Sequence, residues 1–190
     1  MEGPTVTIAQ LWLPILLSAV LVHLASFVVW MVLPFHRTDR GGVKDEEALR
    51  DALKRQGLAP GEYVVPWRPD PKAMNDPAFV RKFEEGPVAL LTVLPAGRPT
   101  MGKNLTQWFV YLLVLSIFLA YLASRTVQPG ADYLAIFRVV GTAALLAHAA
   151  GSFPAAIWFG KPWRTVWKDM VDAVVYALLT AGAFAGLWPR

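Results

Sequence analysis

The chain alternates between long apolar blocks and shorter polar stretches, because its apolar residues are gathered into four runs instead of recurring at a helix or strand period. A helix needs about 20 apolar residues to cross about 30 Å of hydrocarbon. The pattern therefore predicts an all-α membrane protein with four transmembrane helices. The four runs are residues 8–35, 105–123, about 131–159 and about 165–188.

One long polar stretch separates the first run from the second and divides the chain into three parts. We expect residues 1–35 to form the first transmembrane helix, residues 36–104 a small α/β insert, and residues 105–190 the other three helices. The first run lacks a preceding basic residue and is longer than the apolar region of a secretory signal. It is therefore expected to remain as a membrane anchor.

The insert carries the signals of a helix, a strand, a second helix and a second strand. Asp45 as N-cap and Gly57 as C-terminal stop delimit the first helix. Asn75 or Asp76 caps the second helix, with Pro77 at its first position. The segments YVVPW and PVALLTVLP predict two short strands, the second of them buried.

The first insert helix places acids four residues ahead of arginines, at Glu46–Arg50 and Asp51–Arg55, a spacing that favours ion pairs along the helix. An insert of this size is too small for a robust core of its own. It is therefore expected to be either a connector packed on the membrane helices or a docking module for another subunit.

Basic residues predict the orientation of the chain in the membrane. Residues 36–104 contain twelve Lys and Arg and residues 160–168 contain three, whereas the opposite side offers only Arg125 and Arg190. Because Lys and Arg are retained in the cytoplasm, both basic segments should be cytoplasmic and both termini should lie outside. The net charge of +4 is thus interpreted as a topology signal, and no nucleic-acid partner is expected.

Rows of small residues predict where the helices pack, since close backbone approach holds helices together in lipid. The fourth run has an alanine every four residues, and the third run carries a comparable row. Such rows either close a bundle or join it to other membrane subunits or to a second copy of the chain. The predicted packing residues are Gly141, Ala144, Gly151, Ala173, Ala177, Ala181 and Ala185.

Ionisable residues at membrane depth usually mark a function or a buried pair. Arg138 and His148 share one polar face of the third run, which is expected to point inward. Asp169 and Asp172 begin the fourth run, where a helix N-terminus favours negative charge, and Lys168 is spaced to pair with Asp172. The two interpretations are a charge-balanced helix start and an entry site for a proton or cation.

Two histidines lie near the middle of different runs, His23 in the first and His148 in the third. Each has an alanine four residues before it, a spacing that resembles the ligand helices of light-harvesting polypeptides over five residues. The pair therefore suggests a tetrapyrrole, haem or chlorophyll, held by two imidazoles. The alternative is that neutral imidazoles hydrogen-bond across the bundle and no cofactor binds. The chain has no cysteine, which excludes disulfides and cysteine-bound metal.

Several segments along the chain carry a resemblance that covers nearly all of it. They are LWLPILLSAVLV and MVLPFHR near the start, GLAPGEY and MNDPAF in the insert, and MGKNL, GADYLAIFR and YALLTAGAFAGLWPR later. The order of these segments resembles a family of small bacterial four-span inner-membrane proteins with no assigned activity. The resemblance implies a bacterial inner-membrane location and the four-span layout, and it carries over no functional residue.

The sequence contains no phosphate-binding glycine loop, no His-Glu-x-x-His motif and no nucleophile elbow. We therefore expect a non-enzymatic integral membrane protein, a structural or accessory subunit of a membrane complex or of a homo-oligomer. One alternative is a tetrapyrrole-binding protein that uses the two histidines. Another is a pathway for a small solute or a proton, lined by Arg138, His148, Asp169 and Asp172.

Overall fold

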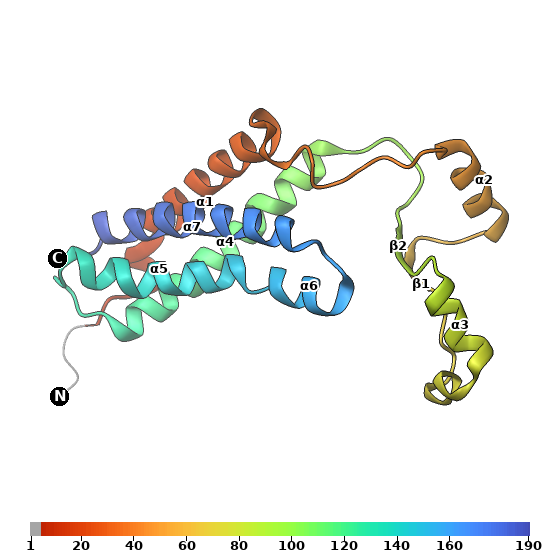
Figure 1. The fold of residues 1–190 in the computed structure, drawn as a ribbon. Helices are drawn as coiled ribbons and strands as arrows, with labels where there is room; N and C mark the ends of the chain where they lie inside the picture. Colours follow the sequence, from red (N-terminus) through yellow and green to blue (C-terminus); the bar gives the residue numbers. More distant parts are fainter. Residues whose placement is uncertain (1–4) are drawn as a thin grey trace. The chain divides into compact units, whose positions relative to one another are not determined.

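The computed structural model describes residues 5–190 and divides the chain into two compact units. One unit, the helix bundle, contains the chain up to Arg40 and from Thr100 to Arg190. The other, the insert unit, is Gly41–Pro99. Figure 1 shows the order of the elements along the chain.

The bundle contains four helical segments that are long and apolar enough to cross a membrane. They are built from α1 (Trp12–Phe27), α4 (Met101–Thr126), α5 (Tyr133–Ala149), α6 (Ser152–Phe159) and α7 (Trp163–Gly186). The four spans are Ile8–Val32, Met101–Thr126, Tyr133–Phe159 and Trp163–Gly186. The prediction of four long apolar helices beside a small sheet is confirmed.

The first span does not remain α-helical to its end. A 3₁₀ turn, Ile8–Leu11, leads into α1, and a π-helical turn, Val28–Val32, follows it. Leu33 then adopts an extended conformation, as expected for a residue before proline. A short 3₁₀ turn, Pro34–His36, ends the segment. The chain therefore changes direction within the stretch that the apolar pattern predicts to be one continuous helix.

The third span is broken near Gly151 and Pro154, residues that interrupt its apolar run in the sequence. Helix α5 ends at Ala149 and α6 begins at Ser152. Pro154 lies in the first turn of α6, where its missing N–H needs no helical partner. Proline is thus accommodated by starting a new helix, and Gly160 in the left-handed conformation ends it.

Helices α5 and α7 pack side by side through their small residues (Figure 1). A Cβ built on Gly141 would lie 3.2 Å from the Cβ of Ala181, so this position has little room for a side chain. Ala144 is fully buried and packs with Ala177 and Leu119 in one cluster. Ala173 and Ala185 of the predicted row are also buried. Gly151, by contrast, is exposed at the break between α5 and α6 and has no close neighbour.

Buried hydroxyl groups join α1 to α4. The Ser18 and Ser116 hydroxyls lie 3.0 Å apart. The indole N–H of Trp108 donates to the Ser26 hydroxyl at 2.9 Å. These hydrogen bonds help to hold the two helices together, because an apolar helix surface is attracted to lipid as much as to another helix.

The outer surface of the bundle is strongly apolar along all four spans. Large exposed side chains include Leu24, Phe118, Leu146, Ile157 and Leu178. Soluble proteins rarely expose contiguous apolar surface of this extent. The surface is therefore compatible with a multi-pass membrane protein.

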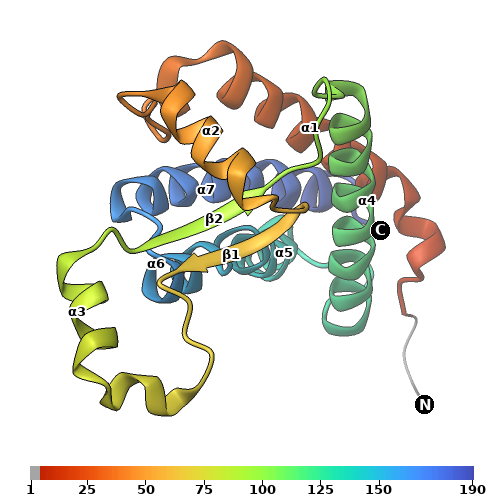
Figure 2. The same ribbon diagram turned by 90° about the vertical axis from the view of Figure 1, so that its right-hand side faces the viewer.

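The insert unit has the predicted order of helix, strand, helix and strand (Figure 2). Strands β1 and β2 pair antiparallel, from Gly61 opposite Val93 to Val65 opposite Ala89. The sequence-predicted caps are confirmed, because the Ala48 N–H donates to Asp45 at 2.9 Å. The elements are α2 (Glu46–Gln56), β1 (Gly61–Val65), α3 (Pro77–Glu85) and β2 (Ala89–Val93).

Two details of the insert differ from the sequence prediction. The ion pairs on α2 join Arg50 to Glu47 and Lys54 to Asp51, one residue closer than the predicted spacing of four. Strand β2 alternates between half-buried and exposed residues, so the prediction of a buried strand is wrong. A two-stranded sheet has no second layer to cover both of its faces, which explains this exposure.

The first prediction concerns the close approach of α5 and α7. Replacing Ala181 with leucine should destabilise the bundle by about 1–3 kcal/mol, because the added carbons overpack the contact with Gly141. Val174→Leu is the matched control, since Val174 is an exposed residue of the same helix. Denaturation of the two variants in mixed detergent micelles, followed by circular dichroism, measures the difference. Equal stabilities would contradict the packing described above.

Candidate functional site

The first half of α7 places three polar side chains on one face. Asp169, Asp172 and Tyr176 are spaced by three and four residues, which brings them into line along a helix. All three border one cavity in the bundle. The polar strip at the start of the fourth span is therefore a wall of a cavity.

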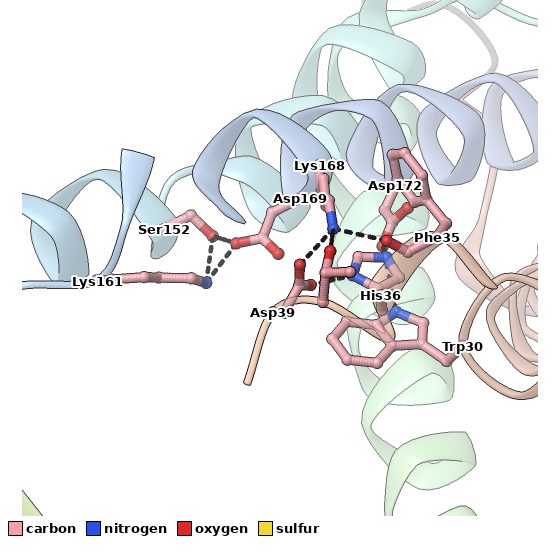
Figure 3. A network of polar contacts seen from close by, with 10 residues as sticks. Trp30, Phe35, His36, Asp39, Ser152, Lys161, Lys168, Asp169 and Asp172 are labelled. Carbon is pink, nitrogen blue, oxygen red and sulfur yellow. Dashed lines mark hydrogen bonds and ion pairs between the residues drawn. The ribbon is translucent and has the colours of Figure 1, made fainter. Parts of the chain in front are cut away.

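Asp172 is a buried carboxylate that two side chains of the first span's end contact (Figure 3). The indole N–H of Trp30 donates to Asp172 Oδ2 at 3.1 Å. The Nε2 atom of His36 lies 3.0 Å from the same oxygen. Residues from opposite ends of the sequence thus meet on one carboxylate oxygen.

His36 is buried and lies between two carboxylates. Its Nδ1 atom is 2.6 Å from Asp39 Oδ2, while its Nε2 atom faces Asp172. The imidazole also stacks on the Trp30 indole, with ring centroids 3.9 Å apart and planes 3° from parallel. The ring is therefore fixed on both nitrogens and on one face.

The number of protons in this cluster follows from its geometry. A neutral imidazole has one N–H and can donate to only one of its two carboxylate neighbours. The contacts of His36 with Asp39 and with Asp172 can both be hydrogen bonds only if the group holds one proton more than a neutral imidazole beside two ionised carboxylates. That proton can be on His36 or on a carboxylate. The group of His36, Asp39 and Asp172 can therefore store one exchangeable proton beside the cavity.

Lys168, a residue of α7, also contacts this cluster. Its ammonium group donates to Asp39 Oδ1 at 2.5 Å and to the carbonyl oxygen of Phe35 at 2.6 Å. Burial by itself would raise the pKa of the Asp39 carboxyl. The hydrogen bonds and charges of Lys168 and His36 outweigh that effect and hold the pKa below its ordinary value of 3.8. Asp39 is therefore ionised at neutral pH.

A second polar group joins the start of α6 to α7, next to the first group (Figure 3). The Lys161 ammonium pairs with Asp169, and the Ser152 hydroxyl donates to the same carboxylate at 2.6 Å. Lys161 is placed for this contact by the turn at Gly160 that ends α6. The break in the third span is thus what brings Ser152 and Lys161 to Asp169.

The cavity, which we call the chamber, has a volume of about 550 Å³ and lies within the bundle. This volume lies in the range of small-molecule sites. Its apolar wall is formed by Phe27, Trp30, Met31, Met101, Leu105, Trp108 and Ala173. Its polar wall is formed by Ser26, Asn104, His148, Ser152, Lys161, Asp169, Asp172 and Tyr176.

The hydroxyl oxygen of Tyr176 is buried behind the chamber lining, with the Trp30 indole as its polar neighbour. The side chain is 5% exposed. The imidazole of His148 contacts the Tyr176 ring edge-to-face, with centroids 5.3 Å apart. Protein atoms cover this hydroxyl, so Tyr176 contributes its ring, and not a free polar group, to the lining of the chamber.

The two predicted tetrapyrrole ligands lie in different surroundings. His148 borders the chamber, whereas His23 packs edge-to-face on Phe109 of α4, with centroids 5.5 Å apart. The Nδ1 atom of His23 is buried and has no hydrogen-bond partner in residues 5–190. The tetrapyrrole hypothesis stays a prediction.

Arg138 is exposed on α5 and does not line the chamber, and its predicted role stays a prediction. One prediction about charged residues is wrong. Lys168 and Asp172 do not pair with each other, because each contacts a residue that follows the first span. The start of α7 is therefore a buried contact surface for the first span and not a solvated helix end.

Sequence reasoning selected Asp169, Asp172 and His148 and missed His36, Asp39 and Trp30. The signal that could have identified them is the motif FHRTD directly after the first apolar run. A histidine and an aspartate three residues apart at a membrane edge form a typical local pair. Comparison of the chain with protein-family models, with curated proteins and with solved structures gave no match.

The second prediction tests the ion pair between Lys168 and Asp39. Lys168→Met should destabilise the bundle by about 3 kcal/mol, because it leaves a largely buried carboxylate without its cation. Lys103→Met is the control, since Lys103 is an exposed lysine of α4 and its loss should change stability by less than about 0.5 kcal/mol. Detergent-micelle denaturation compares the two. If both variants are as stable as the parent, the pair does not secure the end of the first span.

Proposed function

We propose that this chain is a multi-pass protein of the bacterial inner membrane, with residues 36–104 in the cytoplasm and both termini outside. The four long apolar helices and the apolar outer surface support insertion. The twelve Lys and Arg of residues 36–104 support the orientation. The proposed inner-membrane location also follows from the family resemblance of the sequence.

This orientation places the chamber in the cytoplasmic half of the bundle. Its lining comes from the end of the first span, at Trp30 and Met31, and from the start of the second, at Met101 and Asn104. Both of these ends adjoin residues 36–104. A ligand of the chamber would thus reach it from the inner leaflet or from the cytoplasm.

The third prediction tests this orientation with single cysteines, because the natural chain has none. Lys54→Cys in the insert should react with a membrane-impermeant maleimide only after the cells are permeabilised. Gln128→Cys, in the connection between α4 and α5, should react in intact cells. Both positions are exposed, so accessibility within the protein is matched. The reverse pattern of labelling would refute the orientation.

Within the membrane, we propose that the protein is non-catalytic and holds a small molecule in the chamber. The observation that carries this proposal is the cavity of about 550 Å³, whose lining combines apolar and aromatic side chains with Asp169, Asp172 and His148. Apolar walls with a few convergent polar groups are typical of ligand sites. Ionisable groups at membrane depth support a functional site in the same place.

A role as an accessory subunit is the second candidate, and the insert unit favours it. Within residues 41–99 only Phe79 is buried, whereas Trp67 is 70% exposed and Leu94 is 75% exposed. A unit with so little core gains stability by packing on something else. Another membrane-protein subunit or a second copy of this chain would supply that surface.

The fourth prediction tests both roles in one measurement. We expect native mass spectrometry of the protein, purified in mild detergent from its own membranes, to give a mass above that of the chain by one small molecule. Ala173→Leu, which fills the chamber, should lose that excess, while Val174→Leu on the exposed face of α7 should keep it. A further protein mass, retained in both variants, is the outcome expected for an accessory subunit. A bare monomer in every sample would refute both roles.

A further inference from the structure

Most polar side chains that border the chamber already have partners. The pairs are Asp172 with Trp30, Asp169 with Lys161, and Ser26 with Trp108. Opening a buried hydrogen bond or ion pair is unfavourable, so these groups stay with the partners they have. A molecule inside the chamber therefore needs few hydrogen-bonding groups of its own.

The chamber reaches the outer surface of the bundle on one side. Phe27, Met31 and Met101 border it and are 45%, 50% and 48% exposed. Phe27 and Met31 belong to the span Ile8–Val32, and Met101 begins the span Met101–Thr126. In the inserted protein these exposed positions lie at the level of the inner leaflet. The chamber is therefore continuous with that leaflet.

A cavity that opens into a lipid leaflet is filled most readily from that leaflet. Lipid chains are as apolar as the side chains of a membrane helix, so a chain that enters an apolar space loses no favourable surroundings. Water is disfavoured there, because it needs two or more free polar partners. Met31 and Met101 have flexible side chains, which adapt to a flexible ligand. The chamber thus suits an aliphatic chain.

The open side of the chamber, which we call its mouth, is basic. Lys103 adjoins the lining residue Asn104 at the start of α4, and Arg37 adjoins His36, which contacts Asp172. Lys103 and Arg37 are exposed, and neither forms an ion pair within residues 5–190. Basic residues at the inner edge of a membrane attract anionic lipid headgroups. The charge at the mouth therefore complements a phosphate group.

We propose that the chamber holds one acyl chain of an anionic phospholipid of the inner leaflet, with the phosphate beside Lys103 and Arg37. This inference rests on the proposed membrane insertion and on the proposed role of the chamber as a ligand site. It adds the chemical class of the ligand and its route of entry, which is sideways from the bilayer. Binding forms no covalent bond.

The fifth prediction uses photolabelling of the full chain in phospholipid vesicles. The probe is phosphatidylglycerol with a diazirine in one acyl chain, and peptide mass spectrometry identifies the labelled residues. We expect label at Asp172 and Ala173, which border the chamber and are 5% and 1% exposed. Leu178, which is 52% exposed on the outer surface of α7, should also be labelled. Label confined to outer-surface residues would overturn the proposal.

Two variants of α7 separate the chamber from the outer surface. Ala173→Leu, which fills the chamber, should lose the label at Asp172 and keep the label at Leu178. Val174→Leu, at an exposed position of the same helix, should keep both labels. Retained labelling of Asp172 in Ala173→Leu would contradict entry of the chain through the chamber.

The headgroup is tested with the same diazirine chain on phosphatidylcholine, which has no net charge. It should label Asp172 about fivefold more weakly than phosphatidylglycerol does, because it is attracted less to the basic mouth. Lys103→Gln should weaken labelling by phosphatidylglycerol by about fivefold. Arg125→Gln is the matched control, since Arg125 is exposed at the other end of α4. Equal labelling by the two lipids would overturn the assignment to an anionic headgroup.

Native mass spectrometry separates the failure of this inference from the failure of the proposed function. One bound phospholipid in the parent protein, lost in Ala173→Leu, is the expected result. A bound molecule of another kind would overturn the inference and leave the chamber as a ligand site. If no molecule is bound and no chamber residue is labelled, the proposed ligand role and the inference fail together.

Discussion

The position of one histidine between two carboxylates is the contact that holds the end of the first span against the fourth. His36 bridges Asp39 and Asp172, and Lys168 returns from α7 to Asp39, so the segment after the first span is fastened to the fourth span. Trp30 donates to the same Asp172 carboxylate and also lines the chamber, so this contact lies directly beside the cavity. Helix packing through alanine and glycine closes the rest of the bundle, but that packing is nonpolar and would not position an indole or an imidazole.

Local signals in the sequence predicted local structure well. The four apolar helices, the caps at Asp45 and Asp76, and the strand order of the insert all follow from patterns within a few residues of each other. Burial of the alanine row on α7 also follows, because a row of small residues can only favour close approach. These features depend on the chain's own periodicity and need no knowledge of distant residues.

The site was harder to predict because its contacts join residues far apart in the chain. His36 and Asp172 are separated by 136 positions, and the sequence pattern around one does not predict a contact with the other. The acidic residues of α7 could be selected because charge is rare in an apolar run, whereas His36 lay just outside such a run and looked like the start of a polar insert. Gly151 and Pro154 mark the break between α5 and α6 in the sequence, but they do not show that it brings Ser152 and Lys161 to Asp169.

The π-helical turn at Val28–Val32 has a geometric consequence for everything that follows it. Each π-type hydrogen bond encloses one more residue than an α-type bond, so the turn accommodates the equivalent of a single inserted residue. A residue of α-helix corresponds to about 100° of rotation. The side chains beyond the turn are consequently displaced around the axis relative to an unbroken helix. A one-residue change in length at this place, rather than any change of side chain, would turn the end of the segment by about 100° around the helix axis.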